Sequence, residues 1–433
     1  MTLPPEPKAH PAVQTLNWLF RPIEFMDSYR RRYGDAFSVT FVGFETPMVM
    51  ISDPEAIRAL YQGRENGIPP GRSASLEPIV GPRSILLLEG DDHLGRRRLM
   101  LPAFHGERLR AYDQVIVELT NREIDTWPAD EAFPIHPRMQ ALTLEVILRT
   151  VFGVSDPDRS ARLRALLAGL LAQTASPILQ LRVLLARRFG GPDPLAAIER
   201  RIAEVDGLLA AEVAERRRDP NLDSREDVLS MLVAARFEQG EPISDAELRD
   251  QLMTLLLAGH ETTATALAWT FDLLLRHPAS LERLRSDLDA GEDAYLRAVI
   301  AESLRLRPVI PLAGRRLRAE LRVDGFTLPP GTDVTPAIWL THTREDLYPA
   351  PLEFRPERFL DEAPETYGWI PFGGGVRRCL GASFAELEMR VVLRETLGRC
   401  ELRGARRRPE RIARRNITFS PRRGTPVIVG PRR

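Results

Sequence analysis

The most informative stretch of this 433-residue chain reads Phe372-Gly373-Gly374-Gly375-Val376-Arg377-Arg378-Cys379-Leu380-Gly381. It contains one of only two cysteines in the sequence. Its three consecutive glycines can adopt backbone angles that other residues avoid, so the chain can fold closely around a flat ligand. The stretch therefore predicts a loop that presents the thiol of Cys379 to a bound group.

The residues after this cysteine predict a helix over 380–398. Apolar residues recur there at helical spacing, namely Phe384, Leu387, Val391 and Leu397. A helix N-terminus lowers the pKa of a thiol and offers N–H donors to its sulfur. Proteins stabilise a thiolate on haem iron in this way, and the thiolate donates electron density that favours O–O cleavage. Cys379 is therefore the candidate metal ligand, whereas Cys400 has no such setting and is expected to be an inert core thiol.

The spacing Phe-x-x-Gly-x-x-x-Cys-x-Gly, filled by Phe372, Gly375, Cys379 and Gly381, resembles the haem-binding loop of the cytochrome P450 family. The resemblance extends over essentially the whole chain. It implies a haem b cofactor (iron protoporphyrin IX) ligated by Cys379, contacts from Phe372, Gly373 and Gly381, and no other metal. It also implies a mainly α fold with a minor β part, in a single domain whose long central helix crosses over the haem.

A second motif lies in that long helix, which is predicted over 244–276 and begins with Ser244 and Glu247 at the spacing of a capping box. The motif reads Ala258-Gly259-His260-Glu261-Thr262-Thr263. Thr262 can turn its hydroxyl toward the carbonyl of Ala258 and open the helix locally, and Gly259 leaves space for a small molecule. Glu261 can pass protons inward from solvent. In the resembling family such an acid and alcohol pair delivers the protons that O₂ activation consumes, so Glu261 and Thr262 are the candidate catalytic residues, and Ala258 and Gly259 are expected to contact the cofactor.

Two further sets of charged residues complete the resemblance. Glu302 and Arg305 are spaced to share one helix face, and the resemblance implies that they form a buried structural triad with Arg358. Haem propionates need cationic partners, and Arg377 is one candidate by its position. The other candidates implied by the resemblance are His93, Arg97 and Arg315. The choice within each cluster stays open, because neighbouring arginines stand at Arg96, Arg98 and Arg316.

Composition limits the remaining classes. The formal charge is zero, so no overall field favours nucleic acid. The start of the chain has no export signal or membrane anchor, and two cysteines without CxxC spacing exclude a disulfide scaffold or a zinc ribbon, so we expect a soluble cytoplasmic monomer. We expect a single domain over 1–433. Within it, strand signals place a small β-rich part at about 22–68, 308–335 and the C-terminal end, helical periodicity dominates about 113–304, and the thiolate loop is 372–381.

The expected substrate pocket has a mostly apolar wall, which favours a lipophilic substrate such as a fatty acid, terpenoid or polyketide. Its expected residues beyond the helix motif are the 73–88 stretch and Leu255, Thr263, Val309, Ile310, Leu312, Ile417, Thr418 and Phe419. The segment 177–189 is expected to form a lid over the channel. As an amphipathic helix it has the alternative of touching a membrane surface.

Electrons are expected from a separate ferredoxin or flavodoxin type partner, because no GxGxxG after a strand and no cysteine cluster occurs. Residues 377–433 hold 16 Arg against 5 Glu and no Asp, which predicts a basic docking face unless codon bias explains it. The leading hypothesis is a monooxygenase that inserts one oxygen atom from O₂ by hydroxylation or epoxidation. The alternatives are a haem-thiolate peroxygenase or isomerase, and a non-catalytic haem-based binding protein.

Overall fold

The structure, a computed structural model, describes residues 3–44, 46–63, 76–154, 156–174, 196–238, 240–360, 364–415 and 417–432. Two expectations from the sequence are affected by these limits. The proposed lid at 177–189 lies outside the described residues, as do positions 73–75 of the proposed pocket stretch.

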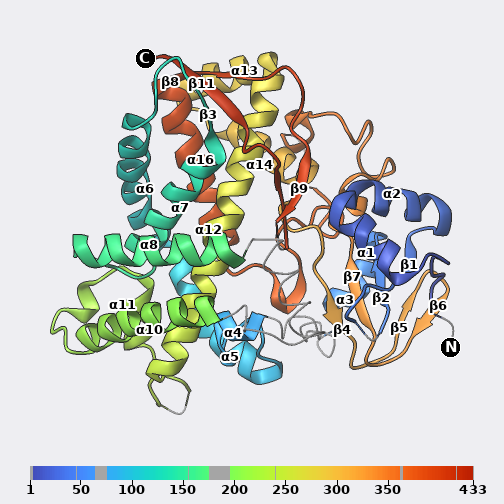
Figure 1. Cartoon of the computed structure of the whole chain (residues 1–433), viewed down its shortest axis with the longest axis horizontal. Helices are drawn as coiled ribbons and strands as arrows, with labels where there is room; N and C mark the ends of the chain where they lie inside the picture. The colour runs from blue at the N-terminus through green and yellow to red at the C-terminus, as the bar shows by residue number, and fades with distance from the viewer. Residues whose placement is uncertain are drawn as a thin grey trace.

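Helices form most of the described chain (Figure 1). The α-helices are α1 Pro11–Phe20, α2 Pro22–Tyr33, α3 Pro54–Gln62, α4 Glu77–Val80, α5 Gly90–Met100, α6 Glu107–Asp125, α7 Ile135–Thr150, α8 Pro157–Thr174, α10 Ala196–Arg217, α11 Val228–Ala234, α12 Asp245–Arg276, α13 Pro278–Asp289, α14 Ala294–Leu306, α15 Ile338–His342 and α16 Ala382–Arg399. Short 3-10 helices are η3 Leu101–Phe104, η4 Leu222–Ser224, η5 Pro356–Phe359 and η6 Gly375–Arg377. The strands are β1 Ala36–Val39, β2 Met48–Ile51, β3 Ala132–Pro134, β4 Arg315–Arg316, β5 Leu321–Val323, β6 Phe326–Leu328, β7 Asp333–Pro336, β8 Cys400–Gly404, β9 Ile412–Arg415, β10 Thr418–Pro421 and β11 Pro426–Arg432.

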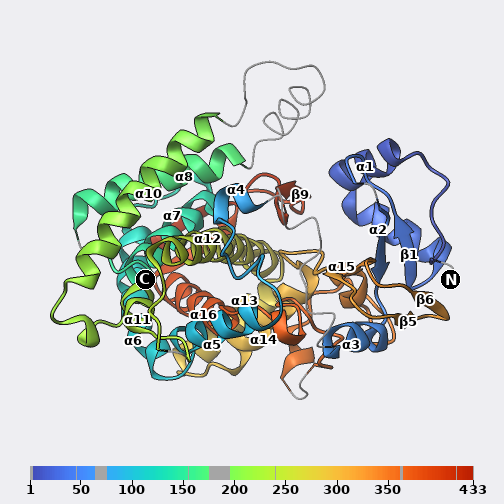
Figure 2. The same ribbon diagram turned by 90° about the horizontal axis from the view of Figure 1, so that it is seen from below.

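The helix-rich part and the strand-rich part lie side by side. In Figure 1 the helices α6, α7, α8, α10 and α11 occupy the left, and β1, β2, β5, β6 and β7 lie on the right with α1 and α2. Figure 2 shows the same separation from below. The mainly α fold with a minor β part, expected from the sequence, is confirmed.

The long helix α12 runs through the middle of the helical part (Figure 2). It begins where the sequence predicts, because the Ser244 hydroxyl accepts a hydrogen bond from the Glu247 N–H at 3.2 Å. The second half of the predicted capping box is absent. The Glu247 carboxylate instead accepts a hydrogen bond from Arg96 of α5 at 2.8 Å, so this acid ties two helices together rather than capping its own.

The main sheet joins two distant parts of the chain. Its strand order is β1-β2-β7-β4, with β2 parallel to β7 and the other two pairs antiparallel. Val49 and Ile51 of β2 and Val334 of β7 are fully buried, and β-branched residues such as these suit a buried sheet. This sheet places Arg315, in β4, beside α3. The other sheets are β3-β11-β8, β10-β9 and β5-β6.

The predicted structural triad fixes the segment that leads to the cysteine loop. Glu302 and Arg305 of α14 form two parallel hydrogen bonds, at 2.6 and 2.8 Å, and both side chains are fully buried. Arg358 of η5 lies 3.4 Å from the same carboxylate. Arg305 also donates to the backbone carbonyls of His342 and Pro351. Residues 342–358 are therefore tied to the core through α14.

Among the described residues, no helix is both long enough and apolar enough to cross a membrane.

Candidate functional site

Cys379 ends a loop that the backbone holds in a defined shape. Its N–H donates to the carbonyl of Phe372 at 2.9 Å, which closes the loop, and the Gly381 N–H donates to the Cys379 sulfur. The side chain of Cys379 is exposed to open space, yet protein atoms surround it closely on the other sides. The thiol is therefore accessible at a position that the protein surrounds closely. Cys400 is fully buried, as expected.

The predicted lowering of the thiol pKa is outweighed by burial. The loss of water around Cys379 raises its pKa, and the Gly381 N–H together with the positive charges of Arg378 and Arg97 lowers it by less. The net direction is upward in the metal-free chain. A metal ion coordinated by the sulfur would remove the proton outright.

The glycine loop fits closely against α3. Gly375 has φ of +63°, and a Cβ there would lie 2.4 Å from the backbone carbonyl oxygen of Tyr61. A Cβ at Gly374 would lie 2.4 Å from the Tyr61 ring. Gly373 also has a positive φ, whereas Gly381 has φ of −89° and open space within 4 Å of its Cβ position. The first three glycines are needed by the loop itself, whereas the position of Gly381 has room for a side chain.

The middle of α12 has one face without protein packing. Leu255, Ala258, Gly259 and Thr262 stand at helical spacings of three and four, and all keep accessible surface although α12 lies inside the molecule. Ala258 is the most exposed of them. The Thr262 hydroxyl donates to the Ala258 carbonyl at 2.6 Å, the geometry that the sequence predicts. This face of α12 therefore borders open space.

Gly259 also serves the packing of α12, besides the role predicted for it. A Cβ at this position would approach the Cδ1 atom of Ile147 in α7 to 3.0 Å. The missing side chain lets α7 pack closely on α12. Its expected contact with the cofactor stays a prediction.

Four cationic or titratable side chains from three elements meet near the cysteine loop. His93 of α5 is buried, and its pKa is lowered to about 4 by burial and by the charges of Arg377, Arg97 and Arg315. Arg315 is buried as well, lies over the Tyr61 ring at 5.0 Å, and donates to the Gly374 carbonyl at 3.2 Å. Burial lowers its pKa. The four residues named from the sequence are thus brought together.

The structure also distinguishes Arg97 and Arg315 from the arginines next to them in the sequence, which have carboxylate partners. Arg96 pairs with Glu247 at 2.8 Å, Arg98 with Glu238 at 2.7 Å, and Arg316 with Asp333 at 2.9 Å. Within the described part of the chain, neither Arg97 nor Arg315 forms an ion pair with a carboxylate. The adjacent arginines are therefore occupied, and the two that remain are available to an anionic ligand.

These observations fit a haem. A buried cluster of cations is costly unless an anion compensates it, and two propionates would supply that charge. Open space at the Cβ position of Gly381, next to the exposed Cys379, and the accessible face of α12 are both compatible with a bound cofactor. Cys379 would hold the iron, and Arg97, Arg315, Arg377 and His93 would hold the propionates.

The Glu261 side chain points away from Thr262 and toward α7. Its carboxylate accepts a hydrogen bond from the Gln140 amide. The Thr265 hydroxyl lies 3.5 Å from Oε1, His136 Nε2 lies 3.8 Å from it, and Arg415 of β9 lies at 4.0 Å. Burial raises the Glu261 pKa, and the Gln140 hydrogen bond and the Arg415 charge oppose this rise. No sequence motif marks Gln140, His136 or Arg415, because these residues come from distant segments.

The predicted pocket wall is only partly open. Ile310 and Leu312 keep some accessible surface, and Ile417 is 56% exposed. Thr263, Val309 and Thr418 are buried. The ring of Phe419 is 1% exposed and packs 6.0 Å from Trp18 within a core cluster, so its assignment to the pocket wall is not supported.

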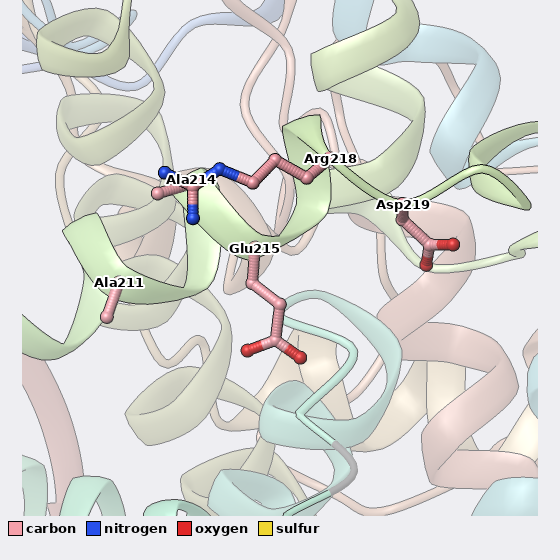
Figure 3. Close-up of a pocket in the computed structure, with 5 residues that line it drawn as sticks. All are labelled: Ala211, Ala214, Glu215, Arg218 and Asp219. Atoms are coloured by element: carbon pink, nitrogen blue, oxygen red, sulfur yellow. The ribbon is translucent and has the colours of Figure 1, made fainter.

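A separate surface hollow of about 530 Å³ lies at the C-terminal end of α10 (Figure 3). Its lining residues are Ala211, Ala214, Glu215, Arg218 and Asp219. Two of its charged groups are already used, because Glu215 pairs with Arg159 at 2.8 Å and Asp219 pairs with Arg225. None of the five lining residues is a predicted site residue, so no ligand is assigned to this surface hollow.

Some residues of the arginine-rich segment 377–433 are engaged with other parts of the molecule. Arg399 pairs with Asp125 of α6 at 2.8 Å, and Arg414 lies over the ring of Trp18 in α1. The Arg407 carbonyl accepts a hydrogen bond from Arg276 at the end of α12. A basic docking face formed by this segment, which spans α16 and four strands, stays a prediction. Arg378, next to Cys379, is exposed.

Comparisons with known proteins agree with this geometry. Residues 4–425 match the family model described as Cytochrome P450. A Mycobacterium tuberculosis protein classed by name as cytochrome P450 135B1 is 43% identical, and the match covers 99% of this chain and 92% of that protein. Another, classed as cytochrome P450 137, is 41% identical over 93% of this chain and 84% of its own length. The solved structure of cyanobacterial CYP120A1 with bound retinoic acid superposes with a TM-score of 0.86 at 26% identity and covers 99% of both chains. The haem domain of cytochrome P450DA superposes at 0.87 with 22% identity, covering 100% of this chain and 98% of that one.

Proposed function

Because the chain belongs to the cytochrome P450 family, we propose that it is a haem-thiolate monooxygenase that inserts one oxygen atom from O₂ into a lipophilic small molecule. The observation that carries the proposal is the thiol of Cys379, which is exposed at the end of the glycine loop and lies near Arg97. Within the described part of the chain, Arg97 and Arg315 form no ion pair with a carboxylate. A bound haem would supply the activation of O₂.

The chain's own residues would have three tasks in this reaction. Cys379 would ligate the iron, helped by the Gly381 N–H at its sulfur. Arg97, Arg315 and Arg377 would fix the cofactor by its propionates. Thr262 would hold a proton donor close to the reaction site. Its hydroxyl lies on the open face of α12 and donates a hydrogen bond to the Ala258 carbonyl.

Glu261 would supply protons from behind that face. Its carboxyl group has a raised pKa, which brings it closer to the neutral range in which a general acid and base works best. The residue keeps about a fifth of its side chain exposed, so it can exchange protons with water.

The substrate is proposed to be lipophilic. Support comes from the apolar side chains of Leu255, Ile310 and Leu312, which keep accessible surface. The solved relative CYP120A1 has retinoic acid bound, a lipophilic molecule, in a structure that superposes along almost the whole chain.

The electron donor is proposed to be a separate ferredoxin or flavodoxin type protein. Arg378 is exposed directly beside Cys379 and would meet an acidic partner there. We expect Arg378→Glu to slow reduction of the haem by an acidic ferredoxin at low salt and to lose this effect at high salt. An equal rate for both proteins at low salt would argue against docking at this face.

Replacing Thr262 with Ala tests the proposed activity. A substrate found by its spin-state shift is turned over with a surrogate ferredoxin and reductase, and product and peroxide are both measured. We expect Thr262→Ala to keep binding the substrate but to release mainly peroxide.

Thr270→Val is the matched control. Thr270 lies on the same helix and donates to the carbonyl four residues back at 2.9 Å, but it is fully buried. Product formation in this control should match wild type. Peroxide-driven turnover at equal rates in wild type and Thr262→Ala would indicate a peroxygenase. Ligand binding without any turnover would indicate a binding function.

A further inference from the structure

The Glu261 carboxyl group is held by side chains that no sequence motif marks. Gln140 of α7 donates to Oε2, and Thr265 donates to Oε1 from one turn further along α12. Thr265 also lies 3.1 Å from Nε2 of the buried His136. These contacts turn the carboxyl group toward α7, while Thr262 faces the open side of α12.

The contribution of each neighbour can be ranked from its charge and burial. Arg415 is 47% exposed and 4.0 Å away, so water and salt screen its charge. His136 is buried with a pKa of about 3, so it is neutral at physiological pH and adds no charge. The Thr265 contact is long. Gln140 makes the closest contact, and its amide keeps the same donor at every pH.

We propose that Gln140 is a positioning residue, whose side-chain amide holds the Glu261 carboxyl group at the α7–α12 interface and stabilises its ionised form there. This inference rests on the proposed function for its catalytic meaning, since that function assigns proton supply to Glu261. The positioning itself concerns two side chains of this chain and can be measured without turnover.

The electrostatic surroundings support the proposal. Burial penalises the charged carboxylate, and the Gln140 hydrogen bond is the largest opposing effect. The charged or titratable groups that face Glu261 are His136 from α7 and Arg415 from β9, with His260 next to it on α12. His260 is buried with a pKa of about 4, so it is also neutral. Without the hydrogen bond from Gln140, the charge of Arg415 would be the next largest effect that stabilises the carboxylate.

The test measures the protonation of Glu261 directly. Infrared difference spectra of the haem-loaded protein are recorded as a function of pH, and Glu261→Gln identifies the carboxyl band that belongs to this residue. In Gln140→Met, which keeps the length of the side chain but has no donor, the midpoint of this band should rise by about one to two pH units. Gln140→Glu keeps the shape and adds a like charge, so it should raise the midpoint at least as far.

Thr143→Val is the matched control. The Thr143 hydroxyl of α7 donates to the His260 carbonyl of α12 at 3.0 Å, so this variant loses a buried hydrogen bond between the same two helices without touching Glu261. Its midpoint should equal that of wild type. The proposal is overturned if Gln140→Met keeps the wild-type midpoint, if Thr143→Val shifts it equally, or if Glu261 stays ionised throughout in both proteins.

The activity arm separates this inference from the proposed function. In Gln140→Met the pH at which peroxide leakage gives way to product should move upward together with the infrared midpoint. A shifted midpoint in a protein that oxidises no substrate would leave the positioning role intact and remove the monooxygenase. An unshifted midpoint in an active monooxygenase would remove the positioning role of Gln140 and leave the proposed function intact.

Discussion

Glu388 of α16 is a carboxyl group inside the core. It is 1% exposed, and its Oε1 atom has no hydrogen-bond partner among the described residues. Burial raises its pKa well above the usual value of 4.5. Because its pKa differs between the folded and the unfolded chain, Glu388 makes the free energy of unfolding depend on pH.

We predict that Glu388→Gln flattens the pH dependence of stability. Because the folded-state pKa is raised, the folded chain holds a proton that the unfolded chain releases above about pH 4.5, so wild-type stability falls as pH rises toward the folded-state pKa. The neutral amide cannot titrate. The variant should gain on wild type by about 1.4 kcal/mol per pH unit across that window, measured by urea unfolding from pH 5 to 8. Parallel curves for the two proteins would contradict this.

At the scale of the element, the glycine loop and the cation cluster depend on α3 and β4. Tyr61 touches both of them, since it limits the space at Gly374 and Gly375 and lies under Arg315. Tyr61 did not stand out in the sequence because it lies more than 250 positions from both partners.

Gly375→Ala should destabilise the loop. The residue has φ of +63°, and the new Cβ would meet a backbone oxygen at 2.4 Å, which a side chain rotation cannot relieve. We expect a loss of at least about 2 kcal/mol in the free energy of unfolding of the haem-free protein. Gly381→Ala is the control, because φ is −89° and no atom lies within 4 Å, and it should change that free energy by less than about 1 kcal/mol. Equal losses would show that the strain is not where the structure places it.

Arg315→Met should affect the haem-free and the haem-loaded protein in opposite ways. Without haem, it removes a buried cation that lacks a carboxylate partner, so stability should be unchanged or higher. With haem, a propionate loses its partner, so haem should pass faster to an acceptor protein.

The neighbouring Arg316→Met is the control for this prediction. It leaves the buried Asp333 without its ion pair, so it should lower stability with or without haem and leave haem transfer unchanged. If Arg315→Met and Arg316→Met behaved alike in both assays, the two arginines would not have the different tasks described here.

The sequence predicted what local patterns determine. The start of α12, the hydrogen bond from Thr262 and the pair Glu302–Arg305 each depend on residues within four positions, and the structure contains all three. The choice of Arg97 over Arg96 was not accessible, because it depends on Glu247, 151 positions away. Gly259 and Gln140 likewise took their meaning from contacts between α7 and α12.

At the scale of the whole molecule, one buried ion pair connects the helical core with the segment before the cysteine loop. Arg305 joins α14 to the carbonyls of His342, Pro351 and Glu353 and lies over the ring of Tyr348. Without Arg305, the fully buried Glu302 carboxylate would lose its two shortest hydrogen bonds and keep the 3.4 Å contact with Arg358.

Arg305→Met should therefore cost about 3–5 kcal/mol in the free energy of unfolding. The matched control is Arg122→Met, which breaks the exposed pair with Glu118, where the side chains are 62% and 50% accessible, and should cost less than about 1 kcal/mol. Urea unfolding measures both. Similar costs for the two variants would mean that burial of the α14 pair adds nothing.

The most direct test of the whole account is the absorption spectrum of the purified, reduced protein under carbon monoxide. A haem held by the Cys379 thiolate should show the strongly red-shifted band of a thiolate-ligated complex, and Cys379→His should lose it while retaining pigment. A wild-type protein with the spectrum of an imidazole-ligated haem, or without pigment after reconstitution, would contradict the account.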